Sequence, residues 1–119
     1  MKIENIKFKA KELGTGKWKE GFLQRDMDYN LCILIAKKEE HSWYWTQIDP
    51  STVCMFTGLK DKNGTPIYEG DIVMYKDNNA ERRGDINWDS KAAAFCFGQD
   101  FLVHYHSEDM VVVGNKFDK

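Results

Sequence analysis

The chain has 119 residues, which is the size of one ordinary domain and is enough to bury a hydrophobic core. Its formal net charge of -2 argues against a dedicated nucleic-acid-binding protein, because phosphate contacts require a basic excess. Its 3 cysteines are an odd number spread along the sequence, which favours a reducing compartment over a disulfide framework. Residues 1–11 show no apolar leader, and the apolar run 31–36 is too short to span a bilayer, so we expect a cytoplasmic protein.

The first predicted elements form a hairpin. Apolar residues alternate with lysines over residues 6–11, which predicts a strand with one solvent-facing side. Gly14 and Gly16 predict a turn. Residues 17–25 form the predicted return strand, in which Gly21 indicates a bulge or a close backbone contact.

Two further strands are predicted before the middle of the chain. The continuous apolar run 31–36 suits a strand buried on both faces, with a short buried helix as the alternative. The aromatic-rich residues 43–48 suit another strand, which Pro50 ends because proline lacks the amide that a ladder needs. We expect Asp49 to cap a short helical turn there, and the strand pattern to resume over residues 53–57.

The central segment predicts a hairpin with sharp corners. Asn63 and Gly64 are a strong signal for a tight turn, because both tolerate a positive φ angle. Residues 67–75 form the predicted return, which Gly70 interrupts as a second turn or bulge. The polar residues 77–83 are predicted to form a loop.

The last third also reads as short strands. We expect strands over residues 85–89, 92–97, 101–105 and 110–113, and no long amphipathic helix anywhere in the chain. The strand spacing predicts a mainly β protein built as a barrel or a sandwich.

One long motif resembles a known family. Residues 56–73 read Phe-Thr-Gly-Leu-Lys-Asp-Lys-Asn-Gly-Thr-Pro-Ile-Tyr-Glu-Gly-Asp-Ile-Val, and from residue 57 onward they are similar to the signature of the YopX family. Residues 6–10 and 16–21 resemble the amino-terminal hairpin of that family, and residues 113–115 resemble its carboxy-terminal Gly-Asn motif. The resemblance covers most of the chain. It implies a protein encoded by a bacteriophage or prophage, working in the cytoplasm of the bacterial host, and it implies no catalytic activity.

The resemblance also implies a fold. We expect a single YopX-like domain over residues 1–119, with a small SH3-like β-barrel over residues 51–119. An N-terminal β-hairpin or meander over residues 1–50 would pack against that barrel, with little helix in the whole chain.

Three acidic residues of the motif, Asp61, Glu69 and Asp71, admit two interpretations. Turn chemistry explains them, since an aspartate at such a turn accepts backbone amides. The functional interpretation is that they face a ligand or a partner.

Two histidines are weak candidates for a metal site. His104 and His106 would share one face of a strand, with a third ligand from His41, Glu108 or a cysteine. The alternative is a pair of exposed polar residues, which we favour because no set of four ligands is visible.

Aromatic and basic residues raise the question of nucleic acid. Trp43 and Trp45 suit a stacking platform for single strands, with phosphate contacts from Arg82 and Arg83. The alternative places the tryptophans in the core or at an oligomer interface, where aromatic residues are enriched. The net negative charge of the chain favours the core or interface interpretation over binding of nucleic acid.

The remaining chemistry favours binding over catalysis. Cys32, Cys54 and Cys96 stand in apolar surroundings and are predicted to be buried and structural. We therefore expect a non-enzymatic accessory protein that needs no cofactor, forms homo-oligomers, binds a host or phage protein, and does not contact a membrane. The alternatives are a single-stranded nucleic-acid-binding module and a metal-dependent hydrolase.

Overall fold

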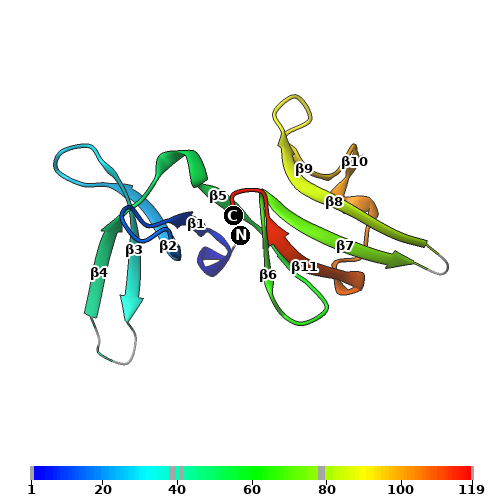
Figure 1. Ribbon diagram of the computed structural model, residues 1–119, viewed down its shortest axis with the longest axis horizontal. Helices are drawn as coiled ribbons and strands as arrows, with labels where there is room; N and C mark the ends of the chain where they lie inside the picture. The colour runs from blue at the N-terminus through cyan, green and yellow to red at the C-terminus, as the bar shows by residue number, and fades with distance from the viewer. Residues whose placement is uncertain (1, 38–39, 41, 78–79, 119) are drawn as a thin grey trace. The chain divides into compact units, whose positions relative to one another are not determined.

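The computed structural model describes residues 2–37, 40, 42–77 and 80–118 and is mainly β (Figure 1). The strands are β1 (Phe8–Lys11), β2 (Trp18–Arg25), β3 (Leu31–Lys37), β4 (Ser42–Gln47), β5 (Cys54–Lys60), β6 (Pro66–Tyr68), β7 (Asp71–Asp77), β8 (Ala80–Asp89), β9 (Ala94–Phe97), β10 (Asp100–Phe101) and β11 (Met110–Asn115). Short 3-10 helices join them: η1 (Ile3–Asn5), η3 (Pro50–Thr52), η4 (Leu102–His104) and η5 (Ser107–Asp109). Within the described ranges, no helix has the length and apolarity needed to cross a membrane.

The chain divides into two compact units, unit 1 over residues 1–55 and unit 2 over residues 56–119. Unit 1 is an antiparallel meander in the order β4-β3-β2-β1, and the first residues of β5 pair with β1. Its core cluster consists of buried Ala10, Ile33 and Ile48, with partly buried apolar side chains packed around them. The mainly β architecture predicted from the sequence is confirmed.

The turns of unit 1 follow the predicted local chemistry. Gly14 and Gly16 both have positive φ angles, of 87° and 69°, in the β1–β2 turn. A Cβ atom at Gly21 would overlap the backbone oxygen of Leu34 on β3, so the predicted close backbone contact is confirmed. Asp49 caps η3 by accepting a hydrogen bond from the amide of Ser51 at 3.0 Å, also as predicted.

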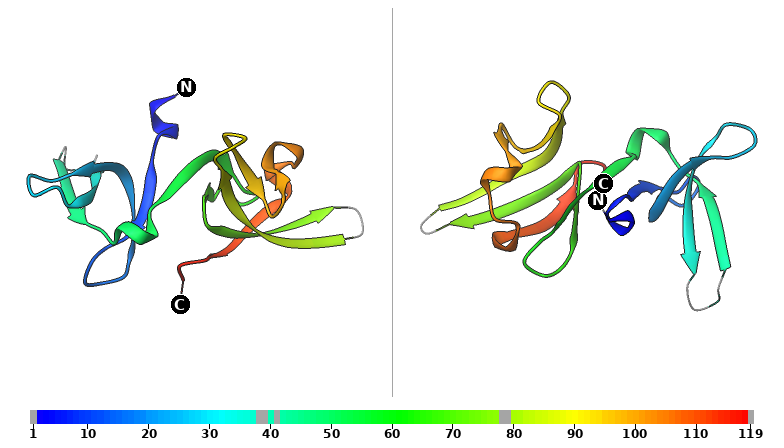
Figure 2. Two further views of the ribbon diagram at one scale, coloured as in Figure 1. Left: turned by 90° about the horizontal axis from the view of Figure 1, so that it is seen from above. Right: turned by 180° about the vertical axis from the view of Figure 1, so that it is seen from behind.

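Unit 2 contains a second antiparallel sheet, in the order β10-β9-β8-β7-β11, together with the short β5–β6 pair. β7 and β8 form a long hairpin, which Figure 2 shows from two further directions. The core of this unit is a cluster of buried apolar side chains: Ile67, Val73, Tyr75, Ile86, Phe97, Leu102 and Met110. Gly84 is required beside this core because a Cβ atom there would lie 2.8 Å from the ring of Phe97.

The turn predicted between β5 and β6 is confirmed, but only one of its two expected positive φ angles is present. Gly64 has a φ angle of 80°, whereas Asn63 does not adopt a positive φ. Asp61 closes the turn, as the turn interpretation of this residue predicts: its backbone oxygen accepts the amide of Gly64, and its carboxylate accepts those of Asn63 and Thr65. An aspartate that bonds its own turn removes the need for two left-handed residues.

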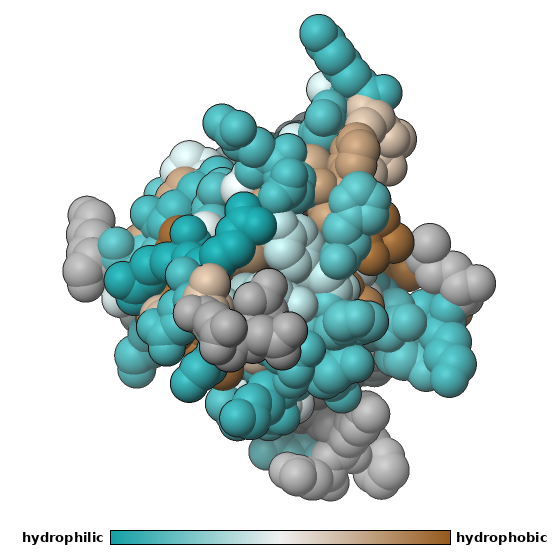
Figure 3. All heavy atoms as spheres, turned by 90° about the vertical axis from the view of Figure 1, so that its right-hand side faces the viewer, coloured by the Kyte–Doolittle hydropathy of each residue, from teal (hydrophilic) through white to brown (hydrophobic). Residues whose placement is uncertain are grey.

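Two predicted boundaries were wrong. Residues 77–83 are largely strand and not loop, because β7 and β8 continue to the pair Asp77 and Ala80; residues 78–79 lie outside the described part of the chain. The polarity of this segment reflects exposure, and Figure 3 shows that the end of unit 2 formed by this hairpin is mainly hydrophilic. The predicted strand 101–105 is also wrong, because β10 ends at Phe101 and the chain then turns into η4.

The closed SH3-like barrel expected for residues 51–119 is not confirmed. The pairings among the described strands give two open sheets with β4, β6, β10 and β11 at their ends. The short β6 and β10 limit closure, because they contain only 3 and 2 residues.

Candidate binding surface

Unit 1 exposes two tryptophans on one side of its sheet. Trp43 and Trp45 stand two residues apart on β4, so they share a face, and 60% and 53% of their surfaces are exposed. Leu34 on β3 lies opposite Trp45, and Phe22 on β2 lies opposite Leu34. We call this row of four side chains, Phe22, Leu34, Trp43 and Trp45, the aromatic face.

The opposite side of the same strands builds the core, which explains why the aromatic face is left outside. Ile33 belongs to the core cluster and Ile35 packs against it, and their cross-strand partners on β4 are Thr46 and Tyr44. Because side chains alternate between the two faces of a strand, the residues between them must point away from the core. The aromatic face is therefore the second face of a sheet whose first face is already packed.

A hollow of about 510 Å³ opens beside Trp45. It is lined by Gln24, Arg25, Asp26, Met27, Asp28 and Trp45. Met27 is almost fully exposed, at 98%, at the tip of the β2–β3 turn. An exposed methionine next to an exposed tryptophan offers an adaptable apolar surface of the kind that binding sites use.

The polar groups around this hollow stabilise their own turn. Asp26 accepts the amides of Asp28 and Asn30, both at 2.9 Å, and the side-chain amide of Gln47 at 3.1 Å. Although partial burial disfavours the charged form, these hydrogen bonds outweigh it and lower the pKa of Asp26 below its ordinary value. The guanidinium of Arg25 likewise donates to the backbone oxygen of Tyr29 at 2.7 Å.

Asp61, the first acidic candidate of the motif, is buried and joins its turn to β11. One carboxylate oxygen accepts the amides of Asn63 and Thr65, and the other accepts the amide of Val112, all at 2.9 Å. This geometry matches the turn interpretation, but the contact with Val112 spans 51 residues and had no signal in the sequence.

Asp71 is fully buried and makes a similar link. Its carboxylate accepts the amide of Tyr68 at 2.8 Å and the side-chain amide of Asn115 at 2.9 Å. Glu69 is half-buried in the turn between β6 and β7. The carboxylates of Asp61 and Asp71 thus both accept hydrogen bonds from amide groups of their own unit.

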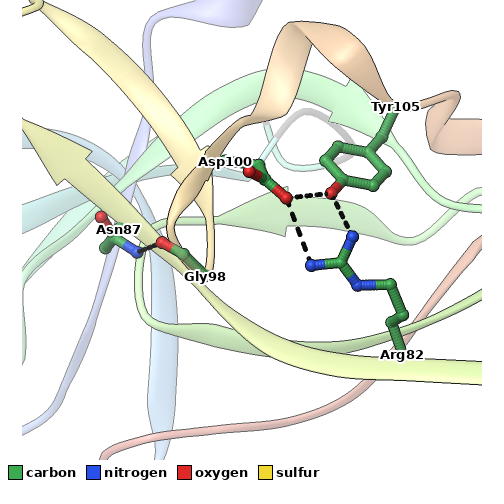
Figure 4. A network of polar contacts seen from close by, with 5 residues as sticks. All are labelled: Arg82, Asn87, Gly98, Asp100 and Tyr105. Atoms are coloured by element: carbon green, nitrogen blue, oxygen red, sulfur yellow. Dashed lines mark hydrogen bonds and ion pairs between the residues drawn. The ribbon is translucent and has the colours of Figure 1, made fainter.

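Arg82 belongs to a polar network in unit 2 (Figure 4). Its guanidinium donates to the hydroxyl of Tyr105 at 2.6 Å and to the carboxylate of Asp100 at 3.2 Å, and that hydroxyl donates to Asp100 at 2.6 Å. The guanidinium also lies 5.9 Å from the centre of the Phe97 ring. Arg83 is exposed on the adjacent position of β8, where alternation directs it to the other face.

The hydrogen bonds of this network shift the ionisation of its members. The bonds from Tyr105 and Arg82 lower the pKa of Asp100, and the bond to Asp100 raises the pKa of Tyr105. Asp100 and Tyr105 were missed in the sequence because they lie 18 and 23 residues from Arg82. The network attaches the segment around η4 to β8.

The chain matches the family model described as YopX protein over residues 7–119, which is nearly its whole length. The chain belongs to the YopX family. The match includes the aromatic face, the buried Asp61 and Asp71, and the Arg82 network. Neither a curated protein nor a solved structure matches this YopX-family chain.

The two histidines of this YopX-family chain stand apart from any strand pair. His104 ends η4 and packs its ring 5.9 Å from that of Phe101, while the imidazole of His106 lies 3.9 Å from the carboxylate of Glu108. Both are exposed, and His41 lies outside the described residues. The described ranges contain no group of three His, Cys, Asp or Glu side chains that could hold a metal ion.

All three cysteines are buried and none forms a disulfide, as the sequence predicted. Burial raises the pKa of the thiols of Cys32 and Cys96, with the neighbouring carboxylates acting in the same direction. A raised pKa leaves little thiolate near neutral pH, which suits a structural role.

Proposed function

We propose that this YopX-family chain is a non-enzymatic accessory protein of a bacteriophage or prophage, which acts in the host cytoplasm by binding proteins, including copies of itself. The observation that carries the proposal is the aromatic face of unit 1, with Trp43 and Trp45 more than half exposed. Large exposed aromatic side chains are enriched at protein interfaces and at the residues that dominate binding energy.

The surroundings of the tryptophans support a docking role. Trp45 borders a hollow of about 510 Å³ that also contains the exposed Met27. The row continues inward through Leu34 and Phe22, so the apolar surface extends across three strands. A contiguous apolar surface of this kind on a soluble domain usually marks an interaction site.

The acidic and basic candidates support binding over catalysis. Asp61 and Asp71 accept hydrogen bonds from backbone or side-chain amides of their own unit, and Arg82 is engaged by Asp100. A catalytic acid, base or nucleophile must instead reach a reacting atom. The hydrogen bonds that these side chains make within their own unit explain their presence as structural.

We also infer that unit 2 has an SH3-like arrangement of an open kind. β7, β8 and β9 form an antiparallel meander, the 3-10 helices η4 and η5 follow, and β11 returns to pair with β7. Superposition of a solved structure of this chain on SH3 domains tests this inference, and a different strand order would refute it.

The binding proposal is tested by affinity capture from phage-infected host cells, followed by mass spectrometry. We expect wild-type protein to recover a defined partner, and the double variant Trp43→Ser/Trp45→Ser to lose it. Trp88→Ser is the matched control, because Trp88 is also exposed, at 42%, but lies on β8 of unit 2. Equal recovery by all three proteins would refute a role for the aromatic face.

The exposed tryptophan pair also favours one second candidate, a single-stranded nucleic-acid-binding module. Bases stack on aromatic side chains, and such binding weakens with salt. A titration of short oligonucleotides followed by tryptophan fluorescence tests it. Quenching that disappears at high salt supports this candidate, and a flat titration at low salt removes it.

A further inference from the structure

β4 differs from the other strands at the ends of the described sheets. β6 contains 3 residues and begins with Pro66, and β10 contains 2 residues. The outer edge of β11 is covered by the β5–β6 turn, because the amide of Lys62 donates to the oxygen of Met110 and the amide of Val112 donates to Asp61, both at 2.9 Å. β4 contains 6 residues, Ser-Trp-Tyr-Trp-Thr-Gln, without charge, proline or glycine. It lacks the devices that normally protect an edge strand from pairing.

The direction of the backbone groups along β4 follows from one hydrogen bond. The amide of Ile48 donates to the oxygen of Leu31 on β3 at 3.2 Å, so the backbone of residue 48 faces β3. In an antiparallel ladder, successive residues face the partner strand and the outside alternately. The backbone of Gln47 should therefore face outward, and its oxygen does accept the amide of Leu13 from the other side at 3.0 Å.

The same alternation makes Trp43 and Trp45 the next outward-facing residues. Their amides and carbonyls point away from β3, and the sheet order places no described strand beyond β4. Tyr44 and Thr46 face β3 with their backbone groups. The two tryptophans thus combine exposed side chains with exposed backbone donors and acceptors.

The open stretch has a defined end. Glu12 forms a bridge with Ile48, and its carboxylate accepts the hydroxyl of Thr46 at 2.6 Å. Together with the hydrogen bond from the amide of Leu13 to the oxygen of Gln47, these contacts cover the edge of β4 after residue 46. Residues 42–46 are therefore the stretch of β4 left open to pairing, and Tyr44 is its midpoint.

Residues 42–46 read Ser-Trp-Tyr-Trp-Thr, which is the same sequence of residue classes in both directions. Antiparallel pairing with an identical strand about Tyr44 would place Trp43 opposite Trp45 twice, Ser42 opposite Thr46 twice, and Tyr44 opposite itself. Aromatic pairs and hydroxyl pairs are favourable across strands. The outward-facing residues would form the hydrogen-bonded pairs, as the ladder geometry requires.

We propose that β4 pairs with β4 of a second copy of this chain, antiparallel and about a two-fold axis at Tyr44. This inference rests on the proposed binding function and names a second copy as one occupant of the same surface. The pairing closes an open edge and joins the aromatic faces of the two copies into one surface. It is an isologous interface, in which each copy contributes the same strand.

Cysteine cross-linking tests the axis directly. Tyr44→Cys places two sulfurs on a non-hydrogen-bonded antiparallel pair, where the Cα atoms are about 4.5 Å apart and within the range that a disulfide spans. We expect a covalent dimer under mild oxidation. Trp88→Cys is the control with an exposed cysteine in unit 2, and the native cysteines are buried and should not react. Cross-linking of Tyr44→Cys no faster than that of Trp88→Cys overturns the proposal.

A second pair of variants covers the case in which Tyr44→Cys does not fold. Trp43→Cys and Trp45→Cys should cross-link faster when mixed than either does alone, because each faces the other residue and not itself. Equal rates alone and mixed contradict the two-fold pairing.

Light scattering separates this inference from the proposed function. We expect wild-type protein to show twice the monomer mass of 13.9 kDa, and Trp45→Lys to show the monomer mass, since charge protects an edge strand. A monomeric wild type that still captures a partner through Trp43 and Trp45 overturns the β4 pairing and self-association, and leaves the proposed binding of another protein standing. A monomer that captures nothing ends both.

Discussion

The buried carboxylate of Asp71 accepts the side-chain amide of Asn115 at 2.9 Å, which ties the end of β11 to the start of β7. Asp71→Ala should lower the free energy of unfolding by about 3 kcal/mol, because it removes the acceptor of two hydrogen bonds from buried donors. Urea denaturation measures the change. Asp28→Ala, at an exposed position, is the control and should change it by less than about 0.5 kcal/mol.

Asp61 should matter far more than Asn63 in the same turn. Asp61→Ala removes the acceptor of three backbone amides and should cost about 2–3 kcal/mol of unfolding free energy. Asn63→Ala should cost less than about 0.5 kcal/mol, because Asn63 is exposed and contributes only its backbone amide. Equal losses in the two variants would contradict the assignment of the turn to the Asp61 carboxylate.

Gly21 should not tolerate a side chain. Gly21→Ala places a Cβ atom against the backbone oxygen of Leu34, so β2 and β3 must separate, at a cost of about 1–3 kcal/mol. Thermal unfolding measures the loss. Lys19→Ala, on the same strand, is the control. A melting temperature of Gly21→Ala equal to that of the control would show that the two strands are not so close.

Acid should weaken the Arg82 network through Asp100. The pKa of Asp100 is lower in the folded chain than in the unfolded chain, so its stabilising effect is present above the unfolded pKa and is lost as the pH falls through the folded pKa. Asp100→Asn should therefore reduce stability at neutral pH and flatten the decline of stability between about pH 5 and pH 2. Unfolding free energies measured across that window test this, with Asp109→Asn as the exposed control. An unchanged pH profile in Asp100→Asn would contradict the role of the ion pair.

Local chemistry explains which parts of the fold were predictable. The glycines at 14 and 16, the cap at Asp49 and the close contact at Gly21 depend on neighbours in sequence or on the absence of a side chain, and all were predicted. Residues 77–83 were mistaken for a loop because a hairpin exposed on both faces has the composition of a loop. Hydrophobic periodicity indicates a strand where one face of the strand is buried. It gives no signal for a strand whose two faces are both exposed.

Long-range partners explain what could not be predicted at the candidate sites. The link from Asp61 to Val112 and that from Asp71 to Asn115 depend on how strands distant in sequence come together. For the same reason the sequence left open whether Trp43 and Trp45 are buried. Only the register of β3 and β4 shows that Ile33 and Ile35 lie on the core side of the sheet. Their partners on β4 alternate with Trp43 and Trp45, so both tryptophans point outward.

The central claim is that the aromatic face of unit 1 is a surface for binding proteins, including further copies of the chain. Its most direct test is the mass of the purified protein, measured by light scattering over a dilution series, for wild type and for Trp43→Ser/Trp45→Ser. We predict that wild type exceeds the monomer mass of 13.9 kDa and approaches it on dilution, while the double variant is monomeric throughout. Indistinguishable masses for wild type and variant at every concentration, with no partner recovered from infected cells by either, would contradict the account.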